Sequence, residues 1–161
     1  MTATRTDLAN KGLSAVLHRA RTEPAYAAFV LLHIGYVVLP LWMGIDKFTK
    51  VLNTDWPGYL APWTVSLLPF SAQTAMYLVG AVEIVAGVLV ALKPRYAAYV
   101  VAAWLAGIIV NLLTYSGFYD VALRDFGLLI GALALALLAS TYDRPWTRAA
   151  GGTPNQDGAV R

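Results

Sequence analysis

Residues 71–115 read SAQTAMYLVGAVEIVAGVLVAL, then KPR, then YAAYVVAAWLAGIIVNLLTY. Each of the two apolar runs, 71–92 and 96–115, has about the 20 residues that a helix needs to cross the hydrocarbon core of a bilayer. The intervening residues, 93–95, form a short basic turn. This stretch therefore predicts two transmembrane helices joined by a tight turn.

Two further runs of the same kind occupy residues 26–48 and 121–142. Residues 116–120 form a short break, whereas 49–70 contain several prolines and aromatic side chains that suit the lipid headgroup zone. We expect this longer loop to lie on the membrane surface and not to form a fifth span. The predicted fold class is all-α, a four-helix transmembrane bundle over residues 26–142.

The composition agrees with a membrane protein. The chain has 161 residues, of which 58% are hydrophobic and 13% are charged, and its mean hydropathy is +0.59. Soluble domains have roughly 45–50% apolar and 25% charged residues, so intrinsic disorder and an ordinary soluble enzyme are excluded. The formal net charge is only +3, and we expect no nucleic-acid partner.

The residues that hold metals and haem are scarce. The chain has no cysteine, which excludes thiolate metal sites, iron–sulfur ligation and disulfide scaffolds. It has two histidines, and His18 lies outside the apolar runs, which disfavours a bis-histidine haem and a catalytic metal site. No nucleotide-binding or hydrolase motif is found. We expect no metal and no covalently bound cofactor.

Lysine and arginine are unevenly distributed between the two sides of the predicted bundle. With four spans, both termini and the turn at 93–95 share one side, which carries nine of these residues against three on the other. The nine are Arg5, Lys11, Arg19, Arg21, Lys93, Arg95, Arg144, Arg148 and Arg161, and the three are Lys47, Lys50 and Arg124. The positive-inside rule then predicts a multi-pass protein of the cytoplasmic membrane with both termini in the cytoplasm.

The two ends of the chain are more polar than the spans. Within residues 1–25 we expect an amphipathic interfacial helix over 8–21, with its basic side chains toward lipid headgroups. Residues 143–161 are expected to form a disordered cytoplasmic tail.

Six charged residues fall near the side opposite the termini: Asp46, Lys47, Lys50, Asp120, Arg124 and Asp125. Three are positive and three negative, so they either pair at the level of the headgroups or line an outward-facing polar pocket. We expect the first for Lys50 and Asp120, and the second for Lys47, Arg124 and Asp125. Asp46 joins these three as a candidate substrate-binding residue.

Glu83 and His33 are the candidate catalytic residues. Glu83 is the only carboxylate deep within a predicted span, near the bilayer midplane, where a charge needs a partner or a function. It can relay protons, donate a hydrogen bond to a carbonyl such as a quinone oxygen, or simply bond a neighbouring helix. We expect His33 at a similar depth, where it either pairs with Glu83 or bonds a backbone carbonyl as a neutral ring.

Two further polar positions lie on predicted helix faces. Arg124 shares a face with Gly127 and Gly131, a GxxxG pattern that permits close helix approach, so we expect Arg124 to point at neighbouring helices. Asn111, in a polar stripe with Gly107, is a candidate substrate-binding residue, although hydrogen bonding between helices explains it equally well.

Several of these residues form a pattern known from one family. GIDKF at residues 44–48, VE at 82–83 followed by Gly87, and LRD at 123–125 resemble the DoxX-like superfamily of small four-span membrane proteins. Its members include DoxX, the DoxD subunit of thiosulfate:quinone oxidoreductase and the membrane protein of the reactive-chlorine-resistance system, to which this chain looks most similar. The resemblance covers residues 26–142.

The resemblance implies a four-helix bundle associated with redox or sulfur metabolism at the membrane, in contact with quinones. It supports Lys47, Glu83, Arg124 and Asp125 as the important positions. We expect an accessory subunit that binds a quinone and works with a protein partner or as a homo-oligomer, at most as a membrane subunit of a quinone-linked oxidoreductase. Two alternatives stay open: a structural or assembly subunit of a respiratory complex, and a small-solute transporter.

Overall fold

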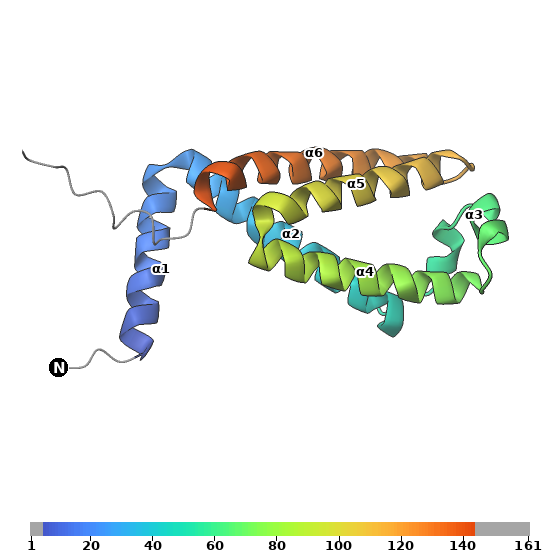
Figure 1. Ribbon diagram of the computed structural model, residues 1–161, viewed down its shortest axis with the longest axis horizontal. Coiled ribbons are helices and arrows are strands. Elements are labelled where there is room, and N and C mark those ends of the chain that lie inside the picture. Colours follow the sequence, from blue (N-terminus) through green and yellow to red (C-terminus); the bar gives the residue numbers. More distant parts are fainter. Residues whose placement is uncertain (1–4, 144–161) are drawn as a thin grey trace, which may run out of the picture.

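The computed structural model of the protein describes residues 5–143, and every regular element in this range is a helix. In chain order they are α1 (Arg5–Thr22), α2 (Pro24–Thr49), the 3₁₀ helix η1 (Trp56–Tyr59), α3 (Pro62–Leu67), α4 (Ala72–Leu92), α5 (Pro94–Leu113) and α6 (Tyr119–Tyr142) (Figure 1).

The four predicted spans are confirmed as helices that are long and apolar enough to cross a membrane: α2, α4, α5 and α6. Their bounds differ from the predicted ones by a few residues. Helix α2 begins at Pro24 and α5 at Pro94, each two residues earlier than predicted. Proline is well suited to a first helical turn, since the amide hydrogen it lacks would have no partner there.

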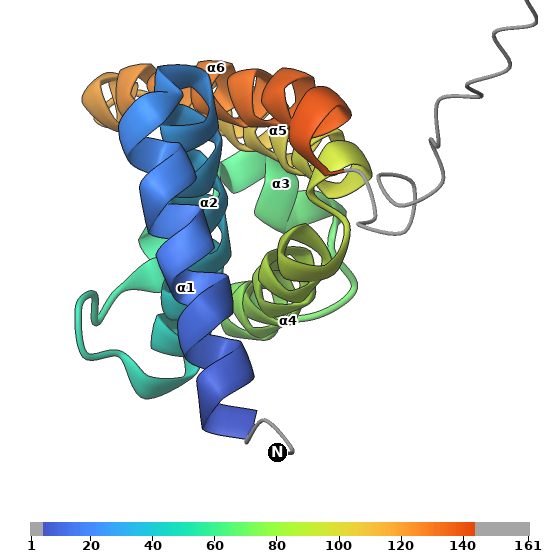
Figure 2. The same ribbon diagram turned by 90° about the vertical axis from the view of Figure 1, so that its left-hand side faces the viewer.

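The N-terminal helix α1 is longer than predicted and crosses one end of the bundle at a steep angle to the spans (Figures 1 and 2). Its junction with α2 is held by Glu23, which accepts hydrogen bonds from Arg19 Nε at 2.8 Å and from the hydroxyl of Tyr142 at 2.5 Å. Hydrogen bonds to the charged carboxylate lower the pKa of Glu23. The bond from the Tyr142 hydroxyl has the larger effect, and the bond from the Arg19 guanidinium has the next largest.

The amphipathic, interfacial character of α1 and the cytoplasmic side of the termini stay predictions. The predicted disordered tail lies outside the described residues from position 144 onward.

The spans form two pairs, in which α2 packs mainly against α4 and α5 against α6. We call the end of the bundle where α2 begins and α6 ends the termini end, and the opposite end the lid end. Residues 51–70, which contain η1 and α3, are called the lid. Figure 1 shows α4 and α5 diverging from their shared turn at the termini end, with α3 beyond their far ends.

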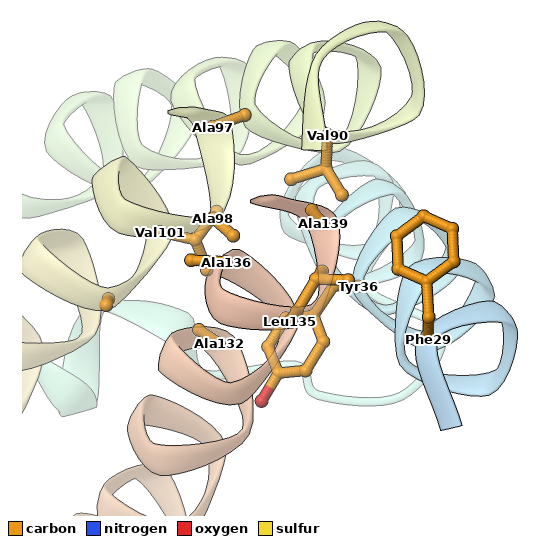
Figure 3. Close-up of a cluster of buried hydrophobic side chains, with 11 residues drawn as sticks. Phe29, Tyr36, Val90, Ala97, Ala98, Val101, Ala132, Leu135, Ala136 and Ala139 are labelled. Atoms are coloured by element: carbon orange, nitrogen blue, oxygen red, sulfur yellow. The ribbon is translucent and has the colours of Figure 1, made fainter. Parts of the chain in front are cut away.

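The buried core lies in the half of the bundle nearer the termini end. Its side chains come from all four spans (Figure 3): Phe29, Tyr36, Val90, Ala97, Ala98, Val101, Ala102, Ala132, Leu135, Ala136 and Ala139. The alanines on α5 and α6 allow these helices to approach closely. Because the pairs converge here and separate toward the lid end, space is left between them near the lid.

Glycines set the closest crossing between α2 and α4. A Cβ atom added at Gly44 would lie 2.7 Å from the carbonyl oxygen of Gly80, and one added at Gly80 would lie 2.8 Å from that of Gly44. By contrast, the close approach predicted for the GxxxG pattern is present only at Gly131, which faces Tyr36, whereas a Cβ atom added at Gly127 would have no atom of another element within 4 Å. The expectation for Gly127 was therefore wrong.

We predict that Gly44→Ala destabilises the folded protein by about 1–3 kcal/mol, because the backbone at Gly80 has to move away from the added methyl group. Gly35→Ala is the matched control in the same helix, since nothing lies within 4 Å of an added Cβ there. The control is expected to be neutral or to stabilise by up to about 1 kcal/mol. Unfolding in mixed micelles, followed by circular dichroism, measures both; equal stability of the two variants contradicts the prediction.

Candidate functional site

A cavity of about 450 Å³ lies between the two helix pairs in the half of the bundle nearer the lid. All four spans and the lid contribute to its walls, which are mainly apolar and aromatic. Among the lining residues are Tyr36, Leu39, Met43, Trp56, Tyr59, Met76, Val79, Trp104, Leu105 and Ile108. An apolar cavity of this size with a few polar groups is the usual form of a small-molecule site.

The main polar feature of the cavity is a buried ion pair. The Nζ atom of Lys47 on α2 lies 2.6 Å from Oε2 of Glu83 on α4, and the two side chains are only 4% and 13% exposed. Lys47 lies three residues beyond Gly44 and Glu83 three residues beyond Gly80, nearly one helical turn in each case, so the close glycine crossing brings the two charges together. Each charge compensates the other in a region of low dielectric.

Lys47 is also in contact with the lid. Its ammonium group lies 4.1 Å from the ring centroid of Trp56, a cation–π contact, and 3.5 Å from the carbonyl oxygen of Met43. A lysine ammonium has three N–H donors. One of these N–H groups donates to Glu83, and a second makes only a long contact with the carbonyl oxygen of Met43. Lys47 can therefore still donate a hydrogen bond to a molecule in the cavity.

The structure does not bring His33 to Glu83. The Nε2 atom of His33 lies 2.9 Å from the carbonyl oxygen of Val90, the backbone-bonded arrangement that was the alternative expectation. Val90 is seven residues beyond Glu83, about 10 Å along α4 toward the termini end. His33 is not among the residues that line the cavity, so the predicted catalytic pair has no geometric support, and the partner of Glu83 is Lys47.

Asp46 was predicted to bind substrate. In the structure it instead anchors the lid to α2 by hydrogen bonds. Its carboxylate accepts hydrogen bonds from the indole Nε1 of Trp56 at 3.0 Å and from three successive backbone amides. Those amides belong to Val51, Leu52 and Asn53, at 2.9, 2.7 and 3.1 Å. Asp46 is 2% exposed and is not a lining residue of the cavity.

Asn111 fastens the other side of the lid to α5. Its Oδ1 accepts from the backbone amide of Ala61 at 3.0 Å and from the hydroxyl of Thr64 at 2.9 Å, while its Nδ2 donates to the carbonyl of Tyr59 at 2.7 Å. Asn111 also lines the cavity. The hydrogen bonds expected between helices are therefore made between a helix and the lid.

Arg124 and Asp125 lie near the start of α6, and both line the cavity. Asp125 is largely buried, with a side chain 13% exposed, whereas the side chain of Arg124 is 64% exposed and its Nε lies 3.8 Å from Oδ1 of Asp125. Arg124 lines the cavity, as expected, but most of its side chain is exposed, so the expectation that it points at neighbouring helices was wrong. Asp120 is exposed, and Lys50 donates to Gln73 Oε1 at 3.0 Å.

Two lining residues that have unpaired polar atoms were not among the candidates predicted from the sequence. Among the described residues, the indole Nε1 of Trp104 and the amide Nδ2 of Asn53 are buried N–H donors with no hydrogen-bond partner. Buried donors are nearly always paired, so such groups beside a cavity call for an explanation. The sequence feature that could have identified Trp104 is its position in the middle of a span. Tryptophan in membrane proteins is enriched at the interfaces, so a tryptophan at mid-span is unusual.

Comparison of the chain with protein-family models, with curated proteins and with solved structures finds no match. Within residues 5–143, no group of three or more His, Cys, Asp or Glu side chains is placed to hold a metal ion.

Proposed function

We propose that this chain is a membrane subunit that binds a lipid-soluble carbonyl compound, such as a quinone, in the cavity and serves a partner that carries the redox cofactor. The observation that carries the proposal is a buried ion pair, Lys47–Glu83, in the wall of a mainly apolar and aromatic cavity. A quinone ring has the matching chemistry, with flat apolar faces and carbonyl oxygens that accept hydrogen bonds.

In the proposed complex Lys47 donates to one carbonyl oxygen of the ring. Lysine is suited to this because its ammonium is held in place by Glu83 and Trp56 and still has donor capacity. The aromatic side chains of Trp56, Tyr59 and Trp104 provide surfaces against which a flat ring packs. In this proposal Asp125, a second largely buried carboxylate in the cavity wall, exchanges protons with the bound molecule.

The electron-transferring group is assigned to a partner because of the amino-acid content of the chain. No cysteine is present and only two histidines are, which excludes thiolate clusters and disfavours a bis-histidine haem. The resemblance to DoxX-like proteins supports the same role. If the termini are cytoplasmic, as the positive-inside rule predicts, the cavity lies in the outer half of the membrane.

Quinone bound to the purified protein tests this proposal. We expect wild-type protein in mild detergent to retain close to one quinone per chain, measured by extraction and mass spectrometry, and Glu83→Ala to retain at least about tenfold less. Asp120→Ala is the matched control, because it removes an exposed carboxylate at the same end of the bundle. Background quinone in all three proteins contradicts the proposal and favours the structural-subunit alternative.

A further inference from the structure

The cavity lies between the packed core at the termini end of the bundle and the lid at the other end. At the termini end the four spans converge on the buried core, in which Leu135, Ala136 and Val90 have no exposed surface. At the lid end the lid is hydrogen-bonded to α2 through Asp46 and to α5 through Asn111. Figure 2, a view onto the termini end, shows α3 lying behind the space between α4 and α5, as expected for a cover at the far end.

The cavity is open at its side, on α5. Gly107 lines the cavity, is itself exposed, and has nothing within 4 Å of an added Cβ atom. Its neighbours in the wall, Trp104 and Ile108, carry large side chains, so the missing side chain at position 107 leaves a gap. Gly107 lies six residues before the end of α5 at Leu113, about 9 Å into the span.

The surface around this gap is apolar. Val110 on α5 is 58% exposed, and Val82 on α4, next to Glu83, is 43% exposed. Helices α4 and α5 separate from their shared turn toward the lid end (Figure 1). In a membrane this flank faces hydrocarbon and not water.

We propose that the ligand enters the cavity sideways from the lipid phase, between α4 and α5 and past Gly107. Its carbonyl-bearing head reaches the Lys47–Glu83 pair, and a hydrocarbon tail lies in the gap and extends into the bilayer. This inference rests on the proposed function and narrows it, because it assigns the ligand to long-tailed carriers dissolved in the membrane. It differs in this from a pathway for a polar solute, which needs an opening to water.

Filling the gap tests the inference. The experiment uses phosphatidylcholine nanodiscs that contain wild type, Gly107→Phe or Gly127→Phe. Binding of decyl-benzoquinone is followed by stopped-flow quenching of tryptophan fluorescence. Trp56 and Trp104 in the cavity wall respond to a bound quinone. Gly127 is the matched control, because nothing lies within 4 Å of a Cβ atom added there either, but Gly127 does not line the cavity. Both variants replace an open glycine within a span, so neither is expected to disturb the fold.

We expect Gly107→Phe to slow association by about tenfold or more, because the added ring obstructs the access path, whereas any loss of tail contacts in the gap changes the release rate separately. Gly127→Phe is expected to behave as wild type. If Gly107→Phe and Gly127→Phe give equal rates, or if Gly107→Phe weakens affinity through faster release alone, access past Gly107 is refuted while quinone binding stands. If wild type does not bind the probe, the proposed function fails and this inference fails with it.

Discussion

Lys47→Met is expected to destabilise the folded protein by about 3–5 kcal/mol, one of the two largest effects that the structure predicts. The substitution leaves the carboxylate of Glu83 in an apolar cavity without its partner at 2.6 Å. The double variant Lys47→Met/Glu83→Leu removes both charges and replaces them with apolar side chains of similar size. It is expected to recover most of the lost stability, because replacing a buried pair by hydrophobic residues is often neutral or favourable.

Unfolding in mixed micelles measures the single and double variants. Arg19→Met is the control, since the Arg19–Glu23 pair is exposed, with side chains 52% and 39% accessible, and its removal is expected to change stability much less. A double variant as unstable as Lys47→Met would show that the two side chains do not act as a pair. If the double variant is stable and retains quinone, the pair is not required to bind the ligand.

Asp46→Ala is expected to release the lid from α2. Four hydrogen bonds end on this carboxylate, from three backbone amides and the Trp56 indole, and alanine replaces none of them. We expect cleavage within residues 51–70 by an added protease to accelerate by about tenfold or more, since lid opening exposes the backbone. Loss of Trp56 from its place also removes the aromatic contact of Lys47, so quinone retention falls.

Asp46→Asn is the informative companion variant, because an amide keeps one acceptor oxygen and is expected to give an intermediate cleavage rate. Asp120→Ala controls for the loss of an exposed carboxylate at the same end. An Asp46→Ala protein whose lid resists the protease as well as wild type would show that other contacts, such as those of Asn111, suffice to hold it.

The spans were predictable because hydrophobic runs of membrane length determine them almost alone. The site was less predictable. The depth of a residue in the membrane follows from its position in the sequence, whereas the direction in which its side chain points depends on which helices pack around it. Asp46 and Lys47 show this. They are adjacent and were both assigned to substrate binding, yet a 100° step around α2 directs Asp46 to the lid and Lys47 to Glu83.

The same limit explains the expected pairing of His33 with Glu83. Their depths were inferred from counts along two helices, but the crossing of α2 and α4 is set by Gly44 and Gly80, where the helices approach so closely that an added Cβ atom would lie 2.7–2.8 Å from the carbonyl oxygen of the other glycine. That register puts Lys47 opposite Glu83 and His33 opposite Val90. The role of Asn111 was equally hidden, since its partners in the lid are 47–52 residues away in sequence.

Photo-cross-linking of the bound molecule tests the central claim most directly. Wild type and the Lys47→Met/Glu83→Leu variant in nanodiscs are illuminated with an azido-benzoquinone that carries its reactive group on the ring, and the labelled peptides are mapped by mass spectrometry. We predict labels concentrated on the cavity wall, around Glu83 on α4 and Trp104 on α5, and their loss in the double variant. Labels spread over the lipid-facing surfaces of all four spans and unchanged in the double variant would contradict a quinone site at the Lys47–Glu83 pair.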